Sequence, residues 1–130
     1  MPKILVVDDD PDCVEMLSIH LKRRGYTVVG ANDAPNALER AAYDRPDLIL
    51  LDVRMPSVDG FRITEILRSN ELTELTPIVL MSAAGKMWAT RRLVPDPTVR
   101  FIEKPLDFDA LDALCALLIR PRGPSEGFPS

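Results

Sequence analysis

The chain has 130 residues, of which 46% are hydrophobic and 28% are charged, as is ordinary for one soluble globular domain. Its 16 basic and 20 acidic side chains give a net charge of −4, which argues against a nucleic-acid or membrane surface as a direct partner. The apolar start stops at three aspartates, residues 8–10, so it is not a signal peptide. Cys13 and Cys115 form no CxxC pair, and we expect free thiols and a cytoplasmic location.

Short apolar runs rich in β-branched residues alternate with segments in which apolar residues recur every three or four positions. In chain order, this pattern predicts a strand at 3–7, a helix at 11–24, a strand at 26–31, a helix at 34–43, a strand at 47–51, a helix at 58–69, a strand at 77–81, a weaker helix at 85–93, a strand at 99–102 and a helix at 107–118. Such alternation predicts an α/β fold, with a parallel sheet covered by helices on both faces.

Polar residues follow the predicted strands where the carboxyl ends of parallel strands form a crevice. They are the aspartates at 8–10, then Asp52, Ser82 and Lys104. Converging carboxylates repel one another unless a cation is present, and oxygen ligands favour Mg²⁺. An aspartate can accept a phosphoryl group, while a metal ion, a lysine and a hydroxyl neutralise the phosphoryl oxygens. The pattern therefore indicates phosphoryl chemistry.

Four segments, in this order, resemble the CheY-like receiver domains of two-component response regulators. They are ILVVDDD at 4–10, DVRMPSVDG at 52–60, PIVLMSA at 77–83 and FIEKP at 101–105. The resemblance implies a three-layer, flavodoxin-like (βα)5 fold whose five-stranded parallel sheet has the order 2-1-3-4-5. We assign 1–119 to the receiver domain. The Pro- and Gly-rich segment 120–130 is expected to be a disordered tail or linker.

The resemblance also implies the function. Asp52 would accept a phosphoryl group from a sensor histidine kinase or a phosphotransfer protein, and the altered domain would control a downstream protein of unknown identity. Such a domain is a signalling module rather than an enzyme. It could also take the phosphoryl group from small donor molecules, and it would lose it slowly. Arg54 and Ala84 occupy the positions that tune this loss.

Mg²⁺ would be held by Asp9, Asp52 and the backbone carbonyl of Arg54, with Asp8 acting directly or from the second coordination shell. Lys104 would pair first with Asp52 and later with the phosphoryl group.

Ser82 would bond a phosphoryl oxygen in the modified state. The movement of Ser82 would turn Phe101 inward, since Phe101 matches the switch aromatic of the family. The Lys104–Pro105 peptide bond is expected to be cis.

Some positions have plainer interpretations or depart from the family. Gly60 is expected to serve the turn into the third helix, and His20 to lie on the surface. Phe101 could be an ordinary core residue, and it lacks the hydroxyl of the tyrosine common there. Pro95 and Pro97 should shorten the fourth helix and stiffen the loop that follows it.

Two other functions compete. One is a binding module that signals without phosphate, suggested by the altered segment before the last strand. The other is a phosphatase of the haloacid-dehalogenase type, because residues 8–10 formally contain an Asp-x-Asp motif after a first strand. The phosphatase interpretation leaves the segment at 52–56 unexplained.

Overall fold

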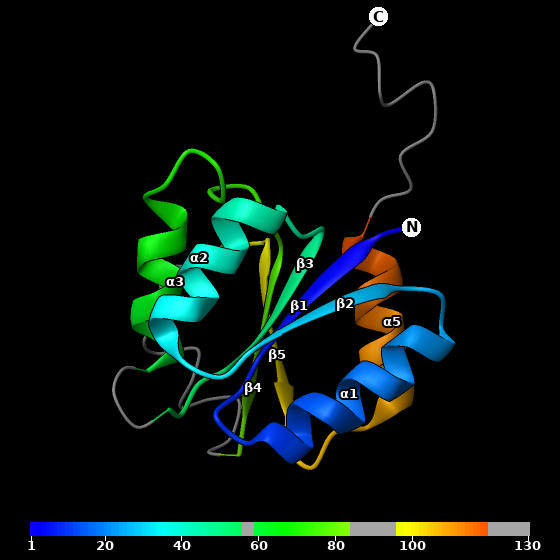
Figure 1. Cartoon of the computed structure of the whole chain (residues 1–130). Helices are drawn as coiled ribbons and strands as arrows, with labels where there is room; N and C mark the ends of the chain where they lie inside the picture. The colour runs from blue at the N-terminus through cyan, green and yellow to red at the C-terminus, as the bar shows by residue number, and fades with distance from the viewer. Residues whose placement is uncertain (56–58, 84–95, 120–130) are drawn as a thin grey trace, which may run out of the picture.

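The computed structural model describes residues 1–55, 59–83 and 96–119. Strands and helices alternate along the described chain as far as β4, and β5 and α5 follow after residues that the structure does not describe (Figure 1). The described elements are β1 (Lys3–Val7), α1 (Pro11–Arg23), β2 (Thr27–Ala31), α2 (Ala34–Asp44), β3 (Leu48–Asp52), α3 (Gly60–Arg68), β4 (Ile78–Ser82), β5 (Val99–Glu103) and α5 (Phe108–Leu118). The predicted fourth helix and the predicted tail lie outside the described residues.

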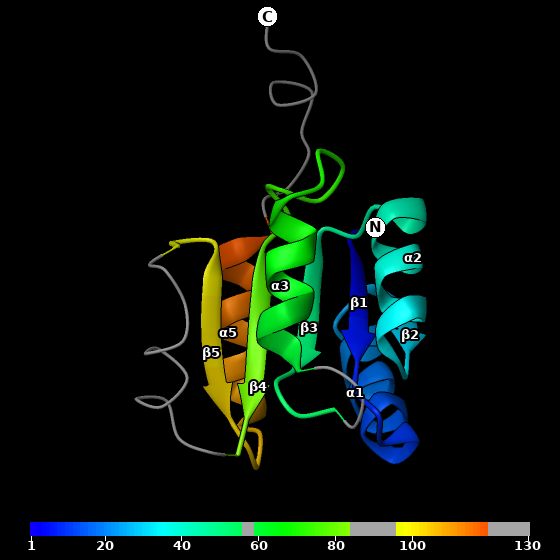
Figure 2. The same cartoon turned by 90° about the vertical axis from the view of Figure 1, so that its left-hand side faces the viewer.

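The five strands form one parallel sheet in the order β2-β1-β3-β4-β5, which confirms the predicted architecture (Figure 2). Val7 is paired with Leu51, so the residues after β1 and at the end of β3 emerge side by side. Asp52 is in turn paired with Met81. The register therefore brings the predicted site residues of β1, β3 and β4 to one edge of the sheet.

Two hydrophobic clusters cover the two faces of the sheet, because successive strand residues point to opposite sides. Leu5, Val7 and Leu51 belong to the cluster beneath α2 and α3. Ile4 and Leu50 belong to the cluster beneath α1 and α5. Every residue of β3 and β4 is buried, as expected for central strands enclosed by helices. Figure 1 shows the resulting three layers, with α2 and α3 on one side and α1 and α5 on the other.

Each described helix begins at an aspartate whose side chain accepts a hydrogen bond from a backbone N–H of the first turn. These caps are Asp10, Asp33, Asp59 and Asp107. A cap of this kind stabilises a helix by about 1 kcal/mol. Because each helix follows a strand, the four capped ends lie toward the carboxyl edge of the sheet.

His20 links α1 to α5 and is not the surface residue that the sequence predicted. Its Nε2 lies 2.8 Å from Asp112 Oδ1, and only 18% of its side chain is exposed. Its ring stacks on Phe108 with 4.3 Å between the ring centroids. Arg24 Nη2 lies 3.1 Å from the other oxygen of Asp112. In the described part of the chain, no helix is long and apolar enough to cross a membrane.

Candidate acidic site at the carboxyl edge of the sheet

Three carboxylates meet where β1 and β3 end. Asp8 and Asp9 follow β1, Asp52 ends β3, and one oxygen of each lies within 4.8 Å of the others. The ammonium of Lys104, just after β5, lies 3.0 Å from Asp8 Oδ2 and 3.5 Å from Asp52 Oδ2. The convergence that the sequence predicted for these residues is therefore present. In the part of the chain that the structure describes, the three carboxylates thus face the one ammonium of Lys104.

Asp8 is the most deeply buried of the three carboxylates, with 1% of its surface exposed. Its Oδ1 accepts a hydrogen bond from the Asp10 N–H at 3.0 Å, and its Oδ2 accepts one from Lys104 at 3.0 Å. Burial raises the pKa of this carboxyl, but bonds from the Asp10 N–H, the Cys13 thiol and Lys104 outweigh burial and hold the pKa below its ordinary value. Lys104 thus pairs with Asp52, as the sequence predicted, but it lies closer still to Asp8.

Asp52 is 7% exposed and is less well stabilised as an anion. Its Oδ1 accepts a hydrogen bond from the Arg54 N–H at 3.2 Å. Burial and the negative charge of Asp8 raise the pKa of Asp52 to about 6, although Lys104 and the Arg54 N–H act in the opposite direction. Among the described residues, the site therefore holds more negative charge than the ammonium of Lys104 balances.

Lys104 is fixed by its backbone as well as by its charge. Its N–H donates to the carbonyl of Ser82 at 2.9 Å, and the following peptide bond, to Pro105, is cis. Burial lowers the pKa of Lys104, but the hydrogen bond to Asp8 and the charge of Asp52 raise it above its ordinary value. The ammonium therefore stays charged beside the carboxylates.

Ser82 ends β4 and is 4% exposed, and its carbonyl contacts the lysine just described. Phe101, on β5, is partly buried and packs against the cluster beneath α2 and α3. Ala84 and the two prolines at 95 and 97 were also singled out from the sequence. Of these, only Pro97 is among the described residues.

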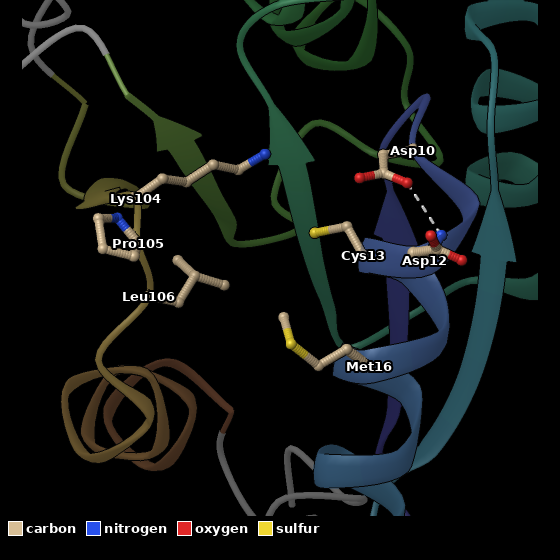
Figure 3. Close-up of a pocket in the computed structure, with 7 residues that line it drawn as sticks. All are labelled: Asp10, Asp12, Cys13, Met16, Lys104, Pro105 and Leu106. Carbon is tan, nitrogen blue, oxygen red and sulfur yellow. Dashed lines mark hydrogen bonds between the residues drawn. The ribbon is translucent and has the colours of Figure 1, made fainter.

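A groove of about 360 Å³ opens beside the acidic site, and no motif predicted it. Cys13 and Met16 line it from α1, and Lys104, Pro105 and Leu106 line it from the segment after β5 (Figure 3). Burial and the neighbouring Asp8 raise the pKa of the Cys13 thiol to about 12, so the thiol stays protonated. Helical periodicity in the sequence could identify Cys13 as a residue of α1 but not its contact with Asp8.

The donor set fits a divalent cation. Three carboxylate oxygens lie close to a common centre, which suits a hard ion that prefers oxygen ligands. The raised pKa of Asp52 reflects a negative charge that a cation would neutralise. Asp9 is exposed, whereas Asp8 and Asp52 are buried, so the centre is accessible from the side of Asp9.

Comparisons with known proteins agree with this geometry. The family model of the response regulator receiver domain matches residues 4–116. The DNA-binding dual master transcriptional regulator RpaA of Synechocystis sp. is 34% identical over 120 residues, which cover 92% of this chain and 50% of RpaA. The chain thus spans about half the length of that relative. Protein PilH of Pseudomonas aeruginosa is 29% identical over 115 residues, covering 85% of this chain and 92% of PilH.

Among solved structures, the chemotaxis protein CheY4 of Vibrio cholerae superposes with a TM-score of 0.84 at 28% identity, covering 91% of this chain and 98% of CheY4. The fold, the acidic edge and the family match therefore lead to one conclusion: the chain belongs to the response regulator receiver domains, the signalling domains of two-component systems, which work with histidine kinases and downstream effectors.

Proposed function

We propose that Asp52 accepts a phosphoryl group from a phosphohistidine of a sensor kinase or phosphotransfer protein. The observation that carries this proposal is the convergence of Asp8, Asp9 and Asp52 with the ammonium of Lys104 at one edge of the sheet. Receiver domains as a family perform signal transduction of this kind, and Asp52 is the acceptor residue that we propose for this chain.

Asp52 is the best nucleophile of the three carboxylates. Asp8 is already held by the Asp10 N–H and by Lys104, and Asp9 is exposed to solvent. Asp52 is buried, and its raised pKa shows that its anion is poorly stabilised. In the transfer, a carboxylate oxygen of Asp52 forms the new bond to phosphorus while the phosphorus–nitrogen bond of the donor breaks. The imidazole keeps that electron pair and takes up a proton.

Other residues would stabilise the phosphoryl group after transfer. The ammonium of Lys104 lies 3.5 Å from Asp52 Oδ2 and can pair with the negative charge of the added phosphoryl group. Ser82 ends the neighbouring strand and brings a hydroxyl to the same edge. Contacts made only in the modified state bias the domain toward a second conformation, with Ser82 and Phe101 as the moving parts.

Mg²⁺ is the cofactor that we propose. Asp9, Asp52 and the carbonyl of Arg54 would hold it, with Asp8 acting directly or through water. When bound, the ion neutralises charge on the phosphoryl oxygens. The same site would react with small phosphodonors and would lose its phosphate slowly, at a rate tuned by Arg54 and Ala84.

The rest of the proposal concerns context. Residues 1–119 form the receiver domain, and 120–130 form a tail or linker. The domain acts in the cytoplasm and controls a downstream protein, and it makes no direct contact with nucleic acid or membrane.

The test is incubation with acetyl phosphate and Mg²⁺, followed by intact-mass measurement. Wild type should gain one phosphoryl group, Asp52→Asn should gain none, and chelation by EDTA should abolish the gain. Asp33→Asn is the matched control, because Asp33 caps α2 and lies outside the acidic site. An unmodified wild type, or an equal gain in Asp52→Asn, would contradict the proposal.

The same preparations address the two competing functions. Multiple turnover of a phosphate ester that is lost in Asp8→Asn and kept in Asp52→Asn would support a phosphatase. Absence of Mg²⁺ binding, together with partner binding that ignores Asp52→Asn, would support a module that signals without phosphate.

A further inference from the structure

We infer that Gly60, the first residue of α3, is a positioning residue that sets the place of the phosphoryl acceptor. This inference rests on the proposed role of Asp52. A Cβ atom built on Gly60 would lie 2.7 Å from the carbonyl oxygen of Asp52 and 3.0 Å from the Cα of Val53. Both contacts are with backbone atoms, which cannot rotate away as a side chain can.

The need for glycine at position 60 is spatial. Gly60 has no positive φ and belongs to α3, so the turn that the sequence predicted for it is not the reason. Its N–H donates to the carbonyl of Val53 at 2.7 Å. Thus α3 begins in direct contact with the backbone segment that carries the acceptor. The hydrogen atoms of Gly60 fit between these two backbone segments, and a larger side chain would not.

The segment after Asp52 is held from two sides. The Val53 N–H donates to the carbonyl of Met81 on β4 at 2.9 Å, while the Val53 carbonyl accepts from Gly60. The next N–H, that of Arg54, donates to the Asp52 carboxylate at 3.2 Å. A displacement of this segment would therefore reach the carboxylate through one peptide unit, and it would move the acceptor relative to Lys104.

The first turn of α3 is held in its helical shape and is packed on the core by buried Phe61 and Ile63, so it resists giving way in place of the acceptor. Asp59 Oδ1 caps it by accepting from the Arg62 N–H at 3.0 Å. The buried hydroxyl of Thr64 donates to the Gly60 carbonyl at 2.8 Å. Atoms added at residue 60 should consequently push on the end of β3, where the acceptor lies.

Gly30 provides a matched control at a comparable distance of approach. A Cβ there would lie 2.8 Å from a side-chain methyl of Val14, between β2 and α1. The crowding is just as tight, but it falls on a side chain away from the backbone of Asp52. Because a side chain can give way and a backbone cannot, Gly30→Ala should lose less stability than Gly60→Ala, and it should leave the rate of phosphorylation unchanged.

The experiment compares the rate of phosphorylation by acetyl phosphate in wild type, Gly60→Ala and Gly30→Ala, with urea unfolding of each. We expect Gly60→Ala to be slower by about tenfold to a hundredfold, since misplacement of a reacting group by about 1 Å has effects of that order. Gly30→Ala should stay within about twofold of wild type. Amide shifts of Val53 and Arg54 should move in Gly60→Ala only.

A second pair of variants applies if Gly60→Ala does not fold. Asp59→Ala removes the cap that holds the start of α3. Asp33→Ala removes the equivalent cap of α2, where Asp33 Oδ1 accepts from the Asn36 N–H at 2.8 Å. Each should lose about the stability of one helix cap. Only Asp59→Ala should also slow phosphorylation, by severalfold.

The outcomes separate this inference from the function on which it rests. If wild type, Gly30→Ala and Gly60→Ala all accept the phosphoryl group at the same rate, the positioning role of Gly60 is wrong. The proposed role of Asp52 as the acceptor is then unaffected. Equal rates in the two cap variants would overturn the role in the same way. If wild type itself accepts nothing, the proposed function fails first.

Discussion

The carboxylate of Asp52 is ionised at neutral pH although its surroundings disfavour a negative charge. Burial and Asp8 raise its pKa from 3.8 to about 6. Between these two values the folded chain binds more protons than the unfolded chain, so this residue lowers stability as the pH rises through that interval. Above a pH of about 6 the whole penalty is present. A residue required for chemistry thus opposes folding.

Asp52→Asn should therefore stabilise the metal-free chain at neutral pH, by about 1 to 3 kcal/mol. The gain should shrink as the pH falls from about 6 and should vanish only well below pH 3.8, where the wild-type carboxyl is protonated in both the folded and the unfolded state. Urea unfolding in EDTA across this range measures the difference between variant and wild type. A variant that is less stable at neutral pH would contradict the argument.

The sequence predicted the positions of single residues well where a motif identified them. It predicted them poorly where a contact between distant residues determines the surroundings of a side chain. The aspartates at 8, 9 and 52 and the lysine at 104 could be placed at one edge, because parallel strands share that edge. The shorter distance from Lys104 to Asp8 could not be predicted, because it depends on which of two neighbouring carboxylates the ammonium reaches. His20 was misjudged because its partner, Asp112, lies 92 residues away.

At the scale of elements, the start of β5 is tied to the end of α3 by one arginine. Arg68 donates to Asp96 at 3.0 Å, to the carbonyl of Thr73 at 3.1 Å and to the hydroxyl of Thr98 at 2.7 Å. Asp96 also accepts from the N–H and hydroxyl of Thr98. These bonds lower the pKa of Asp96 despite its partial burial.

Arg68→Ala should destabilise the chain by about 1 to 3 kcal/mol, because it leaves several partly buried acceptors without their donor. Hydrogen exchange should also speed up at the first residues of β5. Arg40→Ala is the control, since Arg40 lies 3.7 Å from Asp44 and is 44% exposed, and such pairs contribute little. If the two variants lose equal free energy of unfolding, the bonds of Arg68 do not stabilise the start of β5.

The sequence predicted the type and order of every described element, with boundaries within two residues of those observed. Alternation of apolar runs with helical spacing suffices for that. It also predicted a stiff loop before β5 on account of two prolines. Among the described residues of that loop, bonds from Arg68 to Asp96 and Thr98 hold the segment, and local sequence gives no sign of a partner 28 residues away.

At the scale of the whole molecule, three layers place an excess of negative charge at one edge of a stable sheet. The central strands β3 and β4 are buried along their whole length, so the site rests on a well-enclosed part of the sheet. A cation that binds this edge only in the folded chain must stabilise the entire domain, because the carboxylates disperse on unfolding.

Adding Mg²⁺ at ten times its dissociation constant should therefore raise the free energy of unfolding by about 1.4 kcal/mol. Asp9→Ala should lose most of this gain. Asp12→Ala should keep it, because Asp12 is an exposed carboxylate at the same edge but outside the cluster. Urea unfolding at constant ionic strength makes the comparison, and an equal loss in both variants would point to general screening of charge.

The stacking of His20 on Phe108 gives this chain a built-in spectroscopic reporter. His20 is the only histidine of the sequence, so its imidazole protons give a single, unambiguous set of NMR signals. The aromatic ring 4.3 Å away shields those protons, and the shielding falls steeply as the rings separate. Any shift of α5 against α1 on phosphorylation can thus be followed from one resonance, without isotope labelling of the backbone.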